Sequence, residues 1–266
     1  MSLVLDFQRK PTEFKDLTSI ENLSLRGCCE WVTDDVLDEL SVSGHVRNAA
    51  FFRCWRLTDR GLSCFLSRNG KNLQRLELSG CTQLTDATLH SISRFSPGLV
   101  ELDLTRCLGI TDVGINFISS RTLESLLLYA DSQLTSSAYK AIACCEGLRT
   151  LDLCGHCNLD TLHMIRILEA CGDKLEYLNL SWCTELTDEF IDYIISRNKL
   201  HRIKYLSLFG LKNMSKVDAL VRYFENVPSL TEFDIRGIPC AFILSQNDCA
   251  QLREQLPRLT EWKLHH

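Results

Sequence analysis

The segment Leu73-x-x-Leu76-x-Leu78-x-x-Cys81-x-x-Leu84-Thr85-Asp86 occurs three times in this sequence with almost the same residues. The second copy runs from Leu99 to Asp112 and the third from Leu175 to Asp188. Weaker copies begin at Ile20, Val46, Leu123, Leu148, Ile203, Leu230 and Leu259, so that successive copies start 24 to 29 residues apart. A spacing held over ten copies indicates one small structural unit repeated along the chain.

Each copy has the pattern of a short strand followed by a helix. Leu76 and Leu78 lie two residues apart, so both point to one face of a strand. Thr85 and Asp86 offer side-chain oxygens to the free N–H groups at the start of a helix, and Leu89 turns that helix toward the strand. One unit cannot bury its own apolar face, whereas stacked units share a core. We therefore predict an α/β solenoid of horseshoe shape, with about ten strands in a parallel concave sheet and helices on the convex side.

The cysteine and the following Leu-Thr-Asp turn resemble the cysteine-containing type of leucine-rich repeat, which is typical of F-box/LRR proteins. Segments 178–183, 206–210 and 256–260 are similar to plant and protist members of that group. The resemblance implies a leucine-rich-repeat domain over residues 17–266. An F-box is a helical module that precedes the repeats, but only about 16 residues precede the first repeat, and Pro11 interrupts them. We expect residues 1–16 to form an N-terminal cap segment, with strand-like alternation at Leu3 and Leu5, and no F-box.

Composition limits the class of protein. The chain has 266 residues, 45% hydrophobic and 24% charged, with a net charge of -5, which is ordinary for a globular protein. We find no secretory signal and no apolar run long enough to span a membrane. We therefore expect a reducing cytoplasmic location, with the cytoskeleton, the cilium or the nucleus as alternatives, and free thiols. An isoelectric point near 5.8 without a recognition motif argues against nucleic acid.

The fourteen cysteines pose the question of metal or redox chemistry. Five of them share the repeat position and are interpreted as packing groups: Cys28, Cys54, Cys81, Cys107 and Cys183. Cys154-Gly155-His156-Cys157, with Cys144, Cys145 and Cys171 close in sequence, is the one cluster that suggests zinc, but a second Cys-x-x-Cys pair is missing. We expect Cys154 to point to the concave surface. We predict no metal, no cofactor, no catalytic residue and no small-molecule substrate, and a redox role of Cys154 and Cys157 stays open.

Exposed strand positions, which alternate with the core leucines, are the natural binding surface. Three groups of candidate partner-binding residues follow from this register: aromatic Tyr129, Tyr177, Trp182, Tyr205 and Phe209; acidic Glu101, Asp103 and Asp152; and basic Arg53 and Arg56. Aromatic side chains are enriched at interface hot spots, although scattered exposed aromatics are also normal. Arg53 and Arg56 belong to residues 46–75, a segment that contains seven basic residues and one acidic residue. This basic block suits an acidic partner surface, although a solvated face explains it as well.

Three functional hypotheses fit these observations. The first is a non-enzymatic protein-interaction scaffold that serves as a subunit of a larger assembly, resembling the leucine-rich-repeat subunits of the dynein regulatory complex in the ciliary axoneme. The second is the substrate-recognition component of an F-box-type cullin-RING ubiquitin ligase. A thiol- or zinc-dependent enzyme ranks last, and we predict that the protein is not an enzyme.

Overall fold

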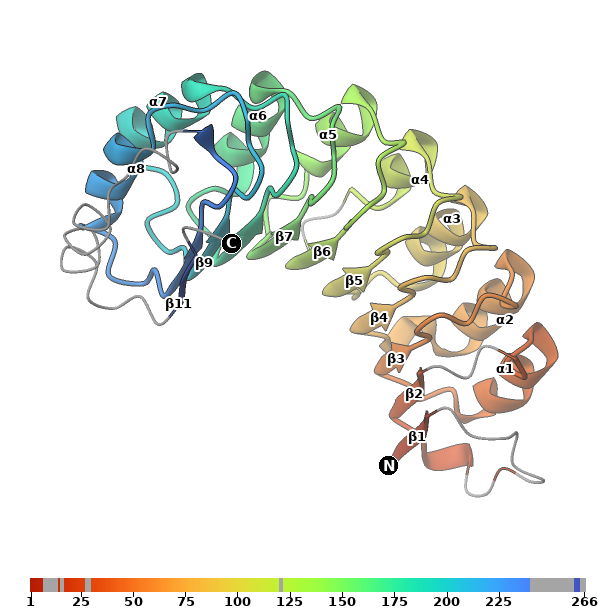
Figure 1. Cartoon of the computed structure of the whole chain (residues 1–266). Helices are drawn as coiled ribbons and strands as arrows, with labels where there is room; N and C mark the ends of the chain where they lie inside the picture. The colour runs from red at the N-terminus through yellow and green to blue at the C-terminus, as the bar shows by residue number, and fades with distance from the viewer. Residues whose placement is uncertain (7–13, 15–16, 27–29, 120–121, 240–260, 264–266) are drawn as a thin grey trace. The chain divides into compact units, whose positions relative to one another are not determined.

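A computed structural model describes residues 1–6, 14, 17–26, 30–119, 122–239 and 261–263. The chain forms two compact units, Met1–Gln133 and Leu134–His266. Each unit is a series of strand–helix repeats in which the helices cover one side of the strands (Figure 1). We call the side of each sheet that faces away from the helices its open face.

In the first unit, every strand pairs in parallel with the next strand along the chain. The strands are β1 (Ser2–Asp6), β2 (Asn22–Arg26), β3 (Asn48–Ala50), β4 (Arg75–Glu77), β5 (Glu101–Asp103) and β6 (Ser125–Leu127). The α-helices are α1 (Asp34–Leu40), α2 (Asp59–Asn69), α3 (Asp86–Phe95) and α4 (Asp112–Phe117), and the short 3-10 helices are η1 (Leu17–Ser19), η2 (Ser41–Ser43) and η3 (Gly70–Asn72).

The second unit follows the same plan, again with parallel pairing in sequence order. Its strands are β7 (Thr150–Asp152), β8 (Tyr177–Asn179), β9 (Tyr205–Ser207), β10 (Glu232–Asp234) and β11 (Glu261–Lys263). Its helices are α5 (Ser136–Ile142), α6 (Thr161–Cys171), α7 (Asp188–Arg197) and α8 (Val217–Phe224). In the described parts of both units, no helix is long and apolar enough to cross a membrane.

These elements confirm the predicted α/β leucine-rich-repeat solenoid. Strands β2 to β11 correspond to the ten predicted copies, and β1 adds one strand at Ser2–Asp6, where the alternation of Leu3 and Leu5 predicted it. Leu76, Leu78 and Leu89 are buried, because strand and helix each present their apolar side to the shared core. The division into residues 1–16 and 17–266 stays a prediction.

The residue before the cysteine position of the repeat has a left-handed backbone in eight repeats, whether or not a cysteine fills that position, with φ between 55° and 87°. These residues are Arg53, Gly80, Arg106, Ala130, Gly155, Trp182, Gly210 and Gly237. The left-handed conformation turns the chain out of the strand and toward the helix. Glycine adopts it without steric cost, so the four larger side chains at this position are held there by their surroundings.

The repeated aspartate acts differently from the prediction. Thr85 does cap its own helix, since its Oγ1 accepts a hydrogen bond from Ala87 N at 3.3 Å. Asp86, however, accepts from the following repeat: Thr111 N lies 2.7 Å from one carboxylate oxygen and Thr111 Oγ1 2.6 Å from the other. The same pair of hydrogen bonds, which we call the aspartate bracket, joins Asp34 to Thr58, Asp59 to Thr85 and Asp188 to Ser215. The aspartate therefore ties neighbouring repeats together.

Candidate functional site

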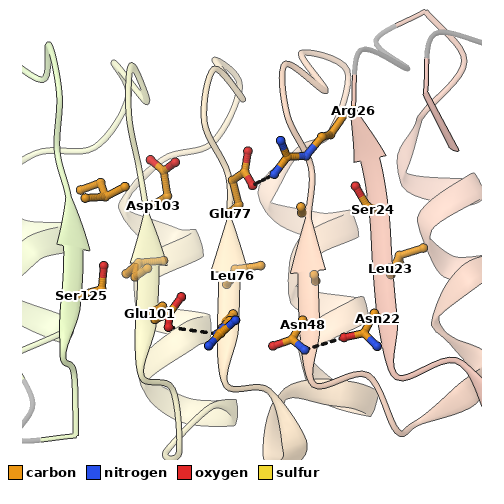
Figure 2. A pocket seen from close by; sticks show the side chains of 15 residues that line it. Asn22, Leu23, Ser24, Arg26, Asn48, Leu76, Glu77, Glu101, Asp103 and Ser125 are labelled. Carbon is orange, nitrogen blue, oxygen red and sulfur yellow. Dashed lines mark hydrogen bonds and ion pairs between the residues drawn. The ribbon is translucent and has the colours of Figure 1, made fainter. Parts of the chain in front are cut away.

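The open face of the first unit holds a shallow groove over strands β2 to β6, with a volume of about 320 Å³ (Figure 2). Small side chains at Ser24, Ala49 and Ala50 hollow out its floor. Polar pairs between neighbouring strands cross it. Asn48 Nδ2 donates to Asn22 Oδ1 at 2.5 Å, as Figure 2 shows.

Charges of both signs line this groove. Arg26 pairs with Glu77 at 2.7 Å, and Arg75 with Glu101 at 3.0 Å (Figure 2). Asp103 accepts a hydrogen bond from Thr105 N, two residues further along the chain. Burial raises the pKa of the Glu77 carboxyl, the Arg26 guanidinium opposes this shift, and Asp103 adds to it. The predicted acidic residues of this unit therefore line the groove, but arginines partly neutralise their charge.

The open face of the second unit carries an aromatic stack. The rings of Tyr177 and Tyr205, from neighbouring strands β8 and β9, lie parallel with centroids 4.3 Å apart. The Tyr177 hydroxyl lies 3.4 Å from Asp152 Oδ2, and Asn179 donates to the same oxygen at 3.0 Å. Burial and the Asp152 carboxylate raise the pKa of Tyr177. Both tyrosines stay half-exposed, so the stack offers a rigid aromatic surface.

A second aromatic cluster follows at the ends of the same strands. Trp182 and Phe209 meet edge to face with centroids 4.9 Å apart, and the Arg236 guanidinium lies 4.9 Å from the Phe209 centroid. Asp234 holds Arg236 through two hydrogen bonds of 2.9 and 2.7 Å. The indole lies over Gly210, where a methyl group would come within 2.8 Å of the ring. Trp182 is nevertheless 44% exposed.

The structure thus gathers five predicted site residues of the second unit on one open face: Asp152, Tyr177, Trp182, Tyr205 and Phe209. Tyr129 belongs to the first unit, where the Arg106 guanidinium lies 5.4 Å from its ring centroid. Arg53 and Arg56 also belong to the first unit and lie in the loop that leaves β3. The strand register did not identify Arg106 or Arg236 as candidate binding residues, although the guanidinium group of each lies over an aromatic ring.

Comparison with known proteins gives consistent results. A family model described as Leucine Rich repeat matches residues 174–189. F-box/LRR-repeat protein 4 of Bos taurus is 28% identical over 200 residues, which cover 75% of this chain and 28% of the relative. The Antagonist of mitotic exit network protein 1 of Candida glabrata is 28% identical over 156 residues, covering 57% of this chain and 30% of the relative. The crystal structure of the Rad7 and Elc1 complex in yeast contains a similar fold, with a TM-score of 0.58, 18% identity, and coverage of 90% of this chain and 74% of that one.

The chain is built of leucine-rich repeats. It spans less than a third of the length of these two curated relatives. Its repeats are similar to those of F-box/LRR proteins, as the cysteine and the Leu-Thr-Asp turn indicated.

The repeat cysteines are packing groups. Cys81 Sγ donates to the Phe51 carbonyl of the preceding repeat at 2.8 Å, and Cys107 Sγ donates to that of Leu78 at 3.1 Å. Burial raises the pKa of both thiols far above the ordinary value, which keeps them un-ionised and unreactive. Cys54 and Cys183 are buried in the same way, whereas Cys28 lies outside the described residues.

The candidate zinc cluster has a different geometry from the one expected. The Cys154 side chain is only 6% exposed rather than on the surface, and burial together with the Asp152 carboxylate raises its pKa to about 12. Cys157 is exposed, and its Sγ lies 3.8 Å from the Trp182 carbonyl oxygen. Within the described ranges, no three His, Cys, Asp or Glu side chains are placed to hold a metal ion.

Two repeats replace the buried cysteine by a titratable group. His156 is fully buried, and its Nδ1 lies 3.2 Å from the Tyr139 hydroxyl oxygen. Asp131 is also fully buried, and no group in the described part of the chain forms a well-aligned hydrogen bond with either of its carboxyl oxygens. Burial, and then the Asp103 carboxylate, raises the pKa of Asp131 to about 8, although the nearby backbone N–H of Cys107 opposes this shift. The sequence placed both residues at the cysteine position, but only the structure shows their burial.

Proposed function

We propose that this protein is a non-enzymatic protein-interaction scaffold, a subunit of a larger assembly that binds partners through the open faces of its sheets. The observation that carries the proposal is the aromatic surface of the second unit, formed by Tyr177, Trp182, Tyr205 and Phe209. Ring stacking already holds these side chains in place, so they would lose little conformational entropy when a partner binds. Similarity to leucine-rich-repeat relatives supports the same general role.

Other predicted residues would extend this contact. Asp152 lies beside the tyrosine stack and would accept hydrogen bonds from a partner. In the first unit, the groove with Glu101 and Asp103 and the half-exposed ring of Tyr129 are further candidates.

The aromatic surface can be tested with a matched pair of variants. Replacing both Tyr177 and Tyr205 by Ala should reduce the recovery of companion proteins in affinity purification at least tenfold, because it removes the stacked rings. Tyr193→Ala, which removes a half-buried tyrosine from α7 in the same unit, should leave recovery unchanged. Equal recovery with all three proteins, at equal thermal stability, would rule out the aromatic surface as the binding site.

The identity of the companions separates the two candidate assemblies. A substrate-recognition component of an F-box-type cullin-RING ubiquitin ligase is the second candidate, and similarity to F-box/LRR-repeat protein 4 over 75% of the chain favours it. A similar fold also occurs in the crystal structure of the Rad7 and Elc1 complex, which agrees with a role within a complex. A cullin adaptor among the companions would support this candidate, whereas a fixed set of axonemal proteins would support a ciliary scaffold in place of it.

A further inference from the structure

The basic block at residues 46–75 is divided into paired and unpaired arginines. Four of its six arginines reach carboxylates of neighbouring repeats, through the pairs Arg47–Glu21, Arg60–Asp34, Arg68–Asp38 and Arg75–Glu101 at 2.8 to 4.0 Å. Among the described residues, no carboxylate lies within ion-pair distance of Arg53 or Arg56. Most of the block is thus neutralised internally, and two guanidinium groups are left for another partner.

The loop that carries both arginines is held in a defined conformation. Cys54, between them, is buried and donates from Sγ to the Leu25 carbonyl at 3.3 Å. The backbone N–H of Arg53 donates to the Ser79 carbonyl at 2.8 Å. With the cysteine anchored inside, the side chains of Arg53, Trp55 and Arg56 project outward, and Trp55 is 47% exposed.

Each arginine lies over an aromatic ring. The Arg53 guanidinium is 5.1 Å from the Phe52 centroid, and that of Arg56 is 5.8 Å from a Trp55 ring centroid. Arg56 Nη1 also donates to the Glu30 carbonyl at 2.9 Å. A guanidinium stacked on a ring keeps its edge N–H groups available and loses little freedom when it binds a carboxylate.

A third arginine occupies the same register two repeats further on. Arg106 shares the left-handed position with Arg53, lies over Tyr129, and is exposed. Gly80 occupies that position in the repeat between them, and the Arg53 stem lies against it, 3.1 Å from where a methyl group would be. Since neighbouring strands are about 4.8 Å apart, Arg53 and Arg106 are roughly 10 Å apart along the edge of the sheet.

We propose that this surface, which we call the arginine rim (Phe52, Arg53, Trp55, Arg56 and Arg106), binds an extended acidic segment of a partner protein. Carboxylates of the segment pair with the guanidinium groups, and an apolar side chain of the segment packs on Trp55. The arginine rim lies in the first unit and does not depend on the aromatic surface of the second.

The surrounding charges favour a short acidic segment over a nucleic acid. Glu77 and Asp103 lie on the adjoining open face of the same unit, and the chain has a net charge of -5. A nucleic acid presents a long, continuous row of phosphates, which such a surface repels along most of its length. A short segment needs to meet only the rim.

The test uses the full chain and two fluorescein-labelled peptides, one in which glutamate alternates with leucine and one in which glutamine replaces every glutamate. Fluorescence anisotropy should show binding of the glutamate peptide and at least tenfold weaker binding of the glutamine peptide. The double variant Arg53→Gln, Arg56→Gln should weaken binding of the glutamate peptide about tenfold or more. The control Arg47→Gln, Arg60→Gln changes the net charge equally but removes paired arginines, and it should stay within about twofold of the unmodified protein.

Each other outcome overturns the proposal. Equal weakening by both double variants would show attraction by overall charge, without a defined rim. No binding of the glutamate peptide, or tighter binding of a labelled single-stranded oligonucleotide, would exclude the acidic-segment class. The variant that lacks Tyr177 and Tyr205 should bind the peptide normally, so that failure of the aromatic surface and failure of the rim are distinguishable.

Discussion

A single repeat position accommodates buried groups of very different polarity. At Cys81 and Cys107 a thiol donates to a carbonyl of the preceding repeat. At His156 the ring lies beside the Tyr139 hydroxyl. At Asp131 a carboxyl group is buried without a well-aligned hydrogen bond from the described residues, and the position can hold it because the acid stays protonated at neutral pH.

The buried Asp131 predicts that stability falls as pH rises. Its folded-state pKa is about 8, whereas an aspartate in an unfolded chain has a pKa of about 3.9. The folded state therefore keeps the proton where the unfolded state has lost it, so this contribution to stability is full below pH 4 and is lost progressively up to about pH 8. The slope from this one group is at most about 1.4 kcal/mol per pH unit.

Urea unfolding of the wild type and of Asp131→Asn at several pH values between 4 and 9 measures this effect. Asparagine has nearly the same shape and does not titrate, so the difference in unfolding free energy between the two proteins should shift in favour of the variant as pH rises. Other titrating groups act equally on both proteins and cancel. A difference that does not change with pH would show that Asp131 is ionised in the folded protein.

At the scale of elements, the aspartate at the start of each helix joins neighbouring repeats. Asp59 accepts from Thr85 N at 2.9 Å, from Thr85 Oγ1 at 2.7 Å and from Thr88 Oγ1 at 2.5 Å. Asp59→Ala should lower the free energy of unfolding by about 1–3 kcal/mol, because hydrogen bonds to a charged group are lost and the buried Thr88 hydroxyl is left without this acceptor. Asp218→Ala, which removes an exposed ion pair with Arg222, should cost less than about 1 kcal/mol. If chemical denaturation showed equal losses of unfolding free energy for the two variants, the aspartate bracket would not stabilise the contact between repeats.

The strands were predictable from the sequence, but the contacts between repeats were not. Leu76 and Leu78 identify a strand by their spacing alone, because the period of a strand is local. Thr85 and Asp86 look like a pair that caps one helix, and Asp86 in fact binds Thr111, 25 residues further along the chain. A local pattern cannot show which neighbour a polar side chain chooses once the repeats stack.

At the scale of the whole chain, the same limit applies to the candidate binding residues. Net charge over residues 46–75 indicated a basic surface, yet Arg75 pairs with Glu101 of the next strand and Arg53 does not pair with a carboxylate in the described structure. Tyr177 and Tyr205 were predicted on one face because strand register is regular, and their stacking at 4.3 Å agrees with that register. The repeat pattern was enough to predict which side chains share a face of the sheet. It could not predict which arginines form ion pairs, because that depends on the side chains that folding brings beside them.

The stacked architecture predicts that damage to one repeat spreads mainly to its neighbours. Leu104 is fully buried, and its backbone N–H donates to the Leu127 carbonyl of the next repeat at 2.9 Å. Leu104→Ala should open a cavity and lower the free energy of unfolding by about 2–5 kcal/mol. Because a repeat contacts only the repeats beside it, native-state hydrogen exchange should quicken most in β4, β5 and β6 and least in β1 and β2. An equal loss of protection over all six strands would show that the first unit opens as one cooperative body, and unchanged stability would contradict the repeat register itself.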